Sequence, residues 1–166
     1  MKLPIPMSCC WLLGILLFVA VPTASPASLD GRVVGVHDGD TITVLGTNKI
    51  QHKIRLAGID APESKQAFGS RSKQNLSKWV YKRQVIVEGD KRDRYRRTVG
   101  VVLVDGHDVN LEQVRSGMAW WYRQYAKEQT PADRQLYETA ENEARAAKRG
   151  LWAGPATVPP WGWRRK

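Results

Sequence analysis

After residue 27, hydrophobic and polar positions alternate in short runs before they take up helical spacing. Three runs come first, GRVVGVH, TITVLG and HKIRLAGI, and the second alternates as a half-buried strand does. The stretch GTNK separates the second and third runs as a turn. Pro62 ends the third run because proline cannot donate a ladder hydrogen bond. Two further strand runs follow, QVIVEG and TVGVVLV, separated by the charged stretch DKRDRYRR.

Three segments have helical patterns. A weak apolar stripe predicts one helix over residues 64–81, and a short helix within residues 109–121 should end at Gly117. The clearest helix has Thr130 as its N-cap, Pro131 at its first position and Gly150 after a basic last turn. Five short strands with about three α-helices predict an α+β domain built on a small barrel. The five-stranded barrel that binds oligonucleotides, the OB-fold, is the natural candidate.

The N-terminus has the features of an export signal. Lys2 precedes CCWLLGILLFVAV, an apolar run of 13 residues, and small residues follow it. Because a bilayer-spanning helix needs about 20 apolar residues, we predict a signal peptide over residues 1–27, cleaved after Ala27 or, as the second choice, after Ala24. A retained N-terminal anchor is the alternative. The mature chain then comprises one domain over residues 28–152 and a tail rich in proline, tryptophan and arginine over residues 153–166.

The cysteine content and the net charge limit the kinds of site and partner that the mature protein can have. Cys9 and Cys10 leave with the signal, so the mature protein has no disulfide, thiolate metal site or cysteine nucleophile. The formal charge of +10 becomes +9 without Lys2. Such an excess favours a polyanionic partner, either nucleic acid or an anionic membrane face. A surface made basic only for solubility is the plainer alternative.

Acidic residues gather where strands should meet. Asp38 and Asp40 flank a glycine before the second strand, and Asp60 follows the third. In an antiparallel meander the start of the second strand lies beside the end of the third, so Asp40 and Asp60 should be neighbours. Oxygen ligands favour Ca²⁺, Mg²⁺ or Mn²⁺ over zinc; Ala61 could add its backbone carbonyl, and Asp38 could bind through water or only shape the turn. Ordinary salt bridges to Arg55 are the alternative.

Arginines and one further acid complete a group of residues suited to hydrolysis of a phosphodiester. Arg55, in the apolar run KIRLAGI, could grip a phosphate bidentately beside the acids. The stretch DRYRR contributes further arginines, although a solvated charged loop is the commoner meaning of such a run. Two arginines and a cation could stabilise the charge that develops on a phosphodiester during attack. Glu63 is then the carboxylate left to activate or position water.

Taken together, the motifs VHDGDTITV, IRLAGIDAPE, DRYRRTVGVVLVDG, VNLEQVRSGMAWWYRQY and AKRGLW resemble those of the thermonuclease (staphylococcal nuclease) family. The likeness covers about residues 32–152, with the motifs in the same order and spacing. It implies an OB-fold barrel with three helices. It also implies a Ca²⁺-dependent endonuclease that cleaves DNA and RNA, prefers unpaired strands and leaves 3′-phosphates.

The resemblance assigns roles to particular residues. Asp40 and Asp60 match the calcium-binding carboxylates, Ala61 matches the carbonyl ligand, and Asp38 matches the nearby acid of the turn. Arg55 and Arg97 match the phosphate-binding arginines, and Glu63 matches the proposed general base. Three positions match substrate contacts: Arg94, Tyr95 and Tyr125.

The chain departs from the family pattern at three positions. Ala61 stands where the best-known member has threonine, a change that a backbone ligand should survive. Arg96 replaces a glycine common before the second arginine, so either Arg96 or Arg97 could take the phosphate. Arg123 stands where a second pocket tyrosine is expected, so no nucleotide preference carries over.

The leading interpretation is therefore an exported nuclease, secreted or periplasmic, monomeric and without an obligate protein partner. A catalytically inactive OB-fold module that only binds nucleic acid is the main alternative, and a cationic envelope-associated protein is a third. Trp120 and Trp121 are expected in the core rather than stacked on bases. Trp161 and Trp163 could reach nucleic acid or lipid, or could dock onto the domain.

Overall fold

The structure is a computed structural model, and it describes residues 27–154 and 158–165. The predicted signal peptide lies outside the described residues except for Ala27, so its cleavage stays a prediction. None of the helices in the described ranges is long and apolar enough to cross a membrane. The elements in chain order are β1 (Ser28–Val36), β2 (Thr41–Gly46), β3 (Gln51–Leu56), β4 (Ile59–Asp60), α1 (Gly69–Val80), β5 (Gln84–Glu88), β6 (Thr98–Val104), β7 (His107–Asp108), α2 (Val109–Arg115), β8 (Trp120–Trp121), η1 (Arg123–Glu128), α3 (Pro131–Ala146), η2 (Gly150–Trp152) and α4 (Pro160–Trp163).

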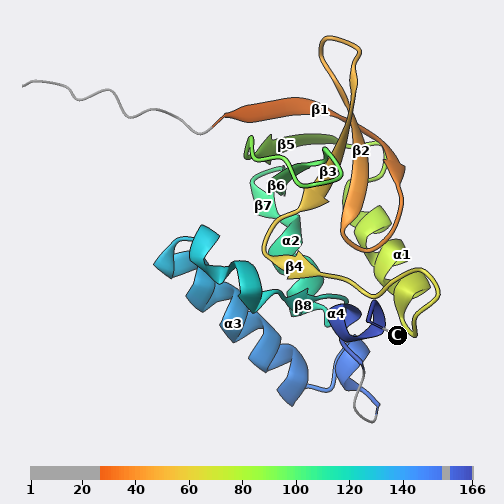
Figure 1. The fold of residues 1–166 in the computed structure, drawn as a ribbon, viewed down its shortest axis with the longest axis vertical. Helices are drawn as coiled ribbons and strands as arrows, with labels where there is room; N and C mark the ends of the chain where they lie inside the picture. Colours follow the sequence, from red (N-terminus) through yellow and green to blue (C-terminus); the bar gives the residue numbers. More distant parts are fainter. Residues whose placement is uncertain (1–26, 155–157, 166) are drawn as a thin grey trace, which may run out of the picture.

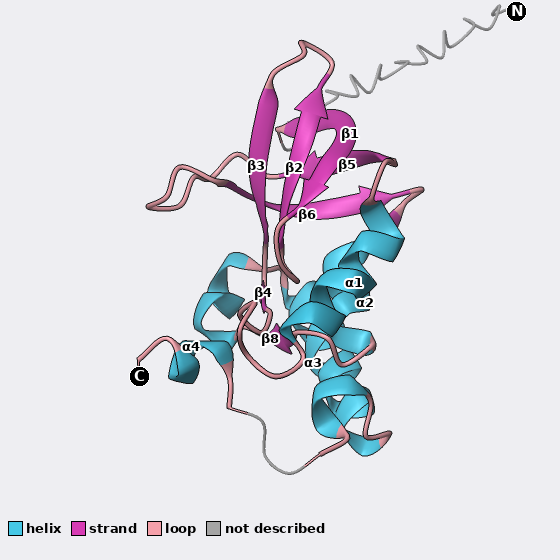
Figure 2. Ribbon diagram, turned by 90° about the vertical axis from the view of Figure 1, so that its right-hand side faces the viewer, coloured by secondary structure: helices cyan, strands magenta, loops and turns pink. Residues whose placement is uncertain are grey.

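Five strands close into a small barrel, which forms one end of the molecule in Figures 1 and 2. The sheet order is β3-β2-β1-β5-β6-β7, and all of these neighbours pair antiparallel. A parallel pairing of β3 with β6 closes the barrel, with Arg55 opposite Val99. The predicted α+β class and the five-stranded OB-type barrel are therefore confirmed.

The antiparallel meander at the start of the barrel is also confirmed. In the pairing of β2 with β3, Thr41 lies opposite Arg55. The Leu56 amide donates to the Asp40 carbonyl (2.8 Å), which extends this pairing by one step. The chain then reaches Asp60 in β4, which pairs with β8 in a separate two-stranded sheet. The fold thus returns Asp60 to the strand end where Asp40 lies.

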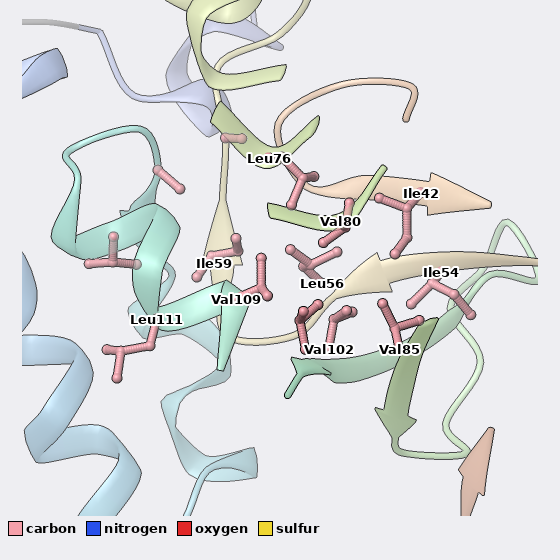
Figure 3. Close-up of a cluster of buried hydrophobic side chains, with 14 of the residues drawn as sticks. Ile42, Ile54, Leu56, Ile59, Leu76, Val80, Val85, Val102, Val109 and Leu111 are labelled. Carbon is pink, nitrogen blue, oxygen red and sulfur yellow. The ribbon is translucent and has the colours of Figure 1, made fainter. Parts of the chain in front are cut away.

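The hydrophobic core fills the barrel and continues beneath the helices (Figure 3). Alternate residues of the strands point inward, as the period-2 pattern of TITVLG predicts, and α1 and α2 cover the opening with their apolar faces. Full burial of such side chains contributes about 1.5–3 kcal/mol each. Most of the core residues are less than 2% exposed, among them Val33, Ile42, Val44, Ile54, Leu56, Ile59, Leu76, Val80, Val87, Val102, Val104, Val109 and Val114.

Capping residues define two of the helices much as the sequence indicates. Asp108 begins α2, and its side chain accepts a hydrogen bond from the Leu111 amide (3.0 Å). Gly117, with a φ of 68°, turns the chain after α2, because a left-handed conformation favours glycine. Thr130 caps α3 by accepting from the Asp133 amide (3.1 Å), with proline next in the chain.

Two predicted helix boundaries are wrong. The first helix begins at Gly69 rather than residue 64, and residues 61–68 form a loop. The loop folds so tightly that a Cβ on Gly69 would lie 2.1 Å from the Glu63 carbonyl oxygen. The last long helix ends at Ala146, because Lys148 already adopts a φ of 50°. Gly150 therefore starts η2 instead of capping α3.

The described part of the tail, residues 158–165, packs against the domain. Residues 160–163 form α4, which Figures 1 and 2 place beside β8. Trp161 stacks on Tyr122, with ring centroids 5.3 Å apart, and meets the edge of Trp120 at 6.3 Å. Of the alternatives for Trp161, docking onto the domain is the one observed. Trp120 and Trp121 are 3% and 6% exposed, which confirms their place in the core.

Candidate metal and phosphate site

The turn before β2 holds Asp40 in a fixed position. The Asp38 side chain accepts a hydrogen bond from the Asp40 amide (3.0 Å), so Asp38 shapes the turn as expected for an aspartate two residues upstream. The buried Gln113 amide donates to the Gly39 carbonyl (2.7 Å). Thr41 donates its hydroxyl to Asp40 Oδ1 (3.1 Å). The Asp40 carboxylate is therefore positioned by its neighbours in the turn and by a residue of α2.

Asp60 and Asp40 are brought together as the sequence predicts. Asp60 is fully buried and Asp40 is 6% exposed. The Ala61 amide donates to Asp40 Oδ2 (2.7 Å), which ties the residue after Asp60 directly to the other acid. Two carboxylates 20 positions apart in sequence thus lie at one corner of the barrel.

Arg55 lies between the two acids. Its Nη1 is 3.1 Å from Asp40 Oδ2, and its Nη2 is 2.8 Å from Asp60 Oδ1. Nη1 also donates to the Leu56 carbonyl (3.1 Å), which fixes the plane of the guanidinium. The salt bridges that the sequence left as the alternative to a cation are therefore present in this structure.

One guanidinium does not fully compensate these acids. Burial raises the pKa of Asp40 to about 7, Arg55 opposes the shift, and the charges of Asp38 and Asp60 add to it. A carboxylate with such a pKa is under strong pressure to gain a proton or a second cation. The corner can therefore accept further positive charge.

The structure distinguishes Arg97 from Arg96. Arg97 Nη1 donates to the Thr41 hydroxyl (3.4 Å), and Thr41 in turn contacts Asp40, so Arg97 reaches the acidic corner through one side chain. Its Nε is held by Asp93 (2.6 Å). Arg96 adopts a left-handed φ of 63°, the conformation that explains a glycine at this position in the family pattern. These positions favour Arg97 for contact with a phosphate.

Glu63 lies on the loop that follows Asp60 and is partly exposed. Its backbone amide donates to the buried Gln66 side chain (3.1 Å). Its carboxylate accepts a hydrogen bond from Arg164 of the C-terminal tail (2.7 Å). Sequence reasoning missed Arg164, because nothing in the run RRK indicates which of its charges, if any, folds back onto the domain.

The residues matched to substrate contacts lie around the corner rather than in it. Tyr95 is 63% exposed, with the guanidinium groups of Arg94 and Arg97 over its ring at 4.8 and 5.3 Å. Tyr125 is also exposed, and its ring meets the edge of Tyr122 at 5.1 Å. Exposed aromatic rings beside cationic groups suit stacking on nucleobases. Tyr95 is connected to the acids through Arg97, whereas Tyr125 belongs to the neighbouring 3-10 helix η1.

Arg123 has a structural role that explains its place in the sequence. Its Nη1 is 2.7 Å from an oxygen of Glu141, which is fully buried in α3. Its guanidinium also lies over the Trp121 ring, 4.4 Å from the centroid. Arg123 therefore compensates a buried acid, which a tyrosine at this position could not do.

The donor groups at the corner fit a hard divalent cation. Asp40 and Asp60 offer carboxylate oxygens without any thiolate or imidazole, and the chemistry of these ligands suits Ca²⁺ or Mg²⁺. In residues 27–154 and 158–165, no group of three or more Asp, Glu, His or Cys side chains is arranged to hold a metal by itself. A cation here would therefore complete its shell with a backbone carbonyl and water, as both ions commonly do.

Comparison with known proteins gives a consistent result. The profile of the family described as "Staphylococcal nuclease homologue" matches residues 53–154. A protein of Shigella flexneri named "Micrococcal nuclease" is 44% identical over 92% of this chain and 88% of its own length. An "Uncharacterized endonuclease" of Haemophilus influenzae is 41% identical over 92% of this chain and 82% of its own. A rice protein named "Probable staphylococcal-like nuclease CAN1" is 38% identical over 69% of this chain and 33% of its own.

Proposed function

The chain belongs to the staphylococcal nuclease family, and on this premise we propose that it is an exported, Ca²⁺-dependent endonuclease of DNA and RNA. The observation that carries the proposal is the pair of buried carboxylates, Asp40 and Asp60, joined by the guanidinium of Arg55. Buried acids repel a polyanion, so a module that only binds nucleic acid has no use for them. A strongly basic chain with an acidic corner suits a site that binds a phosphodiester through a cation.

The cation would be held by Asp40, Asp60 and the Ala61 carbonyl, with Asp38 contributing through water. When bound, it would supply Lewis-acid polarisation of a phosphate oxygen. Mg²⁺ and Mn²⁺ share the same ligand preference, and calcium is proposed because of the family.

The arginines bind and orient the phosphodiester. Arg55 contacts Asp40 directly and Arg97 reaches it through Thr41, so a phosphate beside the acids receives N–H donors from both. Fixed donors that meet developing negative charge contribute on the order of 10²–10³ in rate each. The same two guanidinium groups neutralise the scissile phosphate before attack.

Glu63 is the base in this proposal. Its carboxylate takes one proton from water as the water oxygen bonds to phosphorus and the bond from phosphorus to the 5′-oxygen breaks. The leaving oxygen takes a proton from solvent, which gives a 5′-hydroxyl and a 3′-phosphate. Exposed Tyr95 and Tyr125 would stack on bases, which is easiest in unpaired strands.

The test compares single-stranded DNA, single-stranded RNA and duplex DNA, each with CaCl₂ or with excess EGTA. We expect cleavage only with calcium, fastest on unpaired strands, and products whose 3′ ends become extendable after phosphatase treatment. Arg55→Ala should lower kcat by at least about 10²-fold. Arg83→Ala is the matched control, because the Arg83 side chain bonds to the exposed Asp105 and to the Trp79 carbonyl rather than to the acids of the corner. Equal activity of the two variants would contradict the role given to Arg55.

Export is proposed on the N-terminal pattern alone. Expression of the full chain in a bacterial host should release a product whose N-terminal residue is Ser28. A product that starts at Met1 and stays with membranes would instead support the retained anchor.

A further inference from the structure

The C-terminal tail lies against the proposed cation site through a single arginine. Arg164 Nη2 donates to Asp60 Oδ2 (2.7 Å), and Nη1 donates to both Glu63 Oε1 (2.7 Å) and Asp60 Oδ1 (3.3 Å). Asp60 is the acid proposed to hold the cation, and Glu63 is the proposed base. One guanidinium thus binds both groups at once.

Packing outside the ion pairs holds the tail in this position. The face of Trp161 stacks on Tyr122, and its edge meets Trp120. The buried Gln66 side chain donates to the Val158 carbonyl, and its oxygen accepts from the Glu63 amide (3.1 Å). The loop that carries the base is therefore connected to the tail through Gln66 as well as through Arg164.

Charge explains why Arg164 fits here. Arg55 already bonds to Asp60 Oδ1 and Asp40 Oδ2, and Arg164 takes the other oxygen of Asp60. Because Arg164 also pairs with Glu63, the two guanidinium groups meet three carboxylates, those of Asp40, Asp60 and Glu63. A divalent cation that binds Asp60 meets an oxygen already bonded to Arg164, so the two compete for it.

From these contacts we infer that residues 158–165 form a plug that closes the cation site, with Arg164 as an internal competitor of the divalent ion. The inference rests on the proposed function, because it takes the cation site from it. Binding of the ion displaces Arg164 from Asp60, frees Glu63 and releases Trp161 from Tyr122. The released segment carries Arg164 and Arg165, charges that can then pair with the phosphates of a strand.

The contacts also predict how strong the competition is. Arg164 is 43% exposed at its side chain, so solvent screens its attraction to the acids. Asp60 is buried, however, and two of the three bonds are short and charge-assisted. We therefore expect removal of the guanidinium to lower the Kd for the ion by about three- to tenfold, because one partly screened ion pair no longer competes with it.

Calcium titration of full-chain variants by calorimetry tests this inference. Arg164→Gln should bind Ca²⁺ with a Kd about three- to tenfold lower than the unmodified protein. Arg165→Gln is the matched control, since it removes the same charge from the next, exposed residue. Trp161→Ala, which keeps Arg164 but removes the stacking on Tyr122, should shift the Kd in the same direction by a smaller factor. A second readout is tryptophan emission, which should change on calcium addition in the unmodified protein and change less in Trp161→Phe, where only neighbouring tryptophans such as Trp120 still report release of the tail.

The outcomes separate this inference from the proposed function. An equal Kd for the Arg164 and Arg165 variants would overturn the plug alone, and so would weaker binding in Arg164→Gln. Tryptophan emission that does not change on calcium addition in the unmodified protein would show that Trp161 stays against Tyr122 and Trp120, and would also overturn it. Absence of calcium binding in every variant would overturn the plug together with the cation site.

Discussion

Replacement of Asp40 by asparagine should stabilise the metal-free protein while it removes a proposed cation ligand. Burial, with Asp38 and Asp60 nearby, raises the pKa of Asp40 from 3.8 to about 7. The folded state therefore binds this proton more tightly than the unfolded state does. Stability from the group is fully present below the unfolded pKa and is lost as pH rises through the folded pKa. Above pH 7 the ionised carboxylate therefore lowers the free energy of unfolding.

The size of this effect follows from the shift and from the contacts. The pKa of Asp40 is about three units higher in the folded state than in the unfolded state. This difference lowers the free energy of unfolding by about 4 kcal/mol between low pH and pH 8. Asparagine keeps an oxygen for the Ala61 amide, but it loses the charge that Arg55 meets at 3.1 Å. Arg55 retains Asp60 and the Leu56 carbonyl, and its attraction to the Asp40 charge is already part of the net pKa shift. The gain for Asp40→Asn should therefore approach about 4 kcal/mol at pH 8.

Urea unfolding in EDTA at pH 4 and pH 8 measures the gain. Asp40→Asn and the unmodified protein should differ little at pH 4, and the variant should be the more stable at pH 8. Asp30→Asn, at an exposed position of β1, is the control and should show no such dependence. Calcium at pH 8 should stabilise the unmodified protein and not the variant. A variant that is less stable in EDTA at both pH values would refute the claim that Asp40 is an uncompensated charge.

Three further substitutions test other parts of the site. Arg55→Lys keeps the charge but cannot span Asp40 and Asp60, so kcat on single-stranded DNA should fall by roughly 10²-fold. Gln113→Leu leaves the Gly39 carbonyl without its buried donor and should lower the free energy of unfolding by about 2–3 kcal/mol in urea, with a loss of activity as the turn loosens. Gly69→Ala places a Cβ 2.1 Å from the Glu63 carbonyl, so it should shift this loop, lower activity and cost about 1–3 kcal/mol of stability. Gly154→Ala, where nothing lies within 4 Å, is its control and should change neither quantity.

The barrel and the acidic corner could be predicted because they depend on local patterns and on one topological rule. Alternation in TITVLG marks the inward face of β2, and a meander necessarily returns the end of β3 to the start of β2. Asp40 and Asp60 meet for that reason. Helix boundaries were less predictable, because the start of α1 depends on a tight contact between Gly69 and the Glu63 carbonyl that no local pattern records.

The position of Arg164 was beyond sequence reasoning for a different physical reason. The contact spans 104 positions, from Asp60 to the tail, and depends on Trp161 finding the face of Tyr122. Neither a basic run nor a proline-rich composition specifies a partner at that distance. Arg123 is a related case, since its partner Glu141 lies 18 positions away and is buried where α3 packs against α2 and β8.

The contacts of Arg55 and Arg164 explain how the acidic corner persists in the absence of the proposed ion. Buried carboxylates destabilise a fold unless positive charge accompanies them. Arg55 provides one such charge from within the barrel, and Arg164 provides a second from the tail. Because the second charge sits on a short segment that is partly exposed, it can leave when a divalent ion arrives. A fixed arginine in the barrel at the same place would stabilise the metal-free fold equally well, but it would exclude the ion permanently.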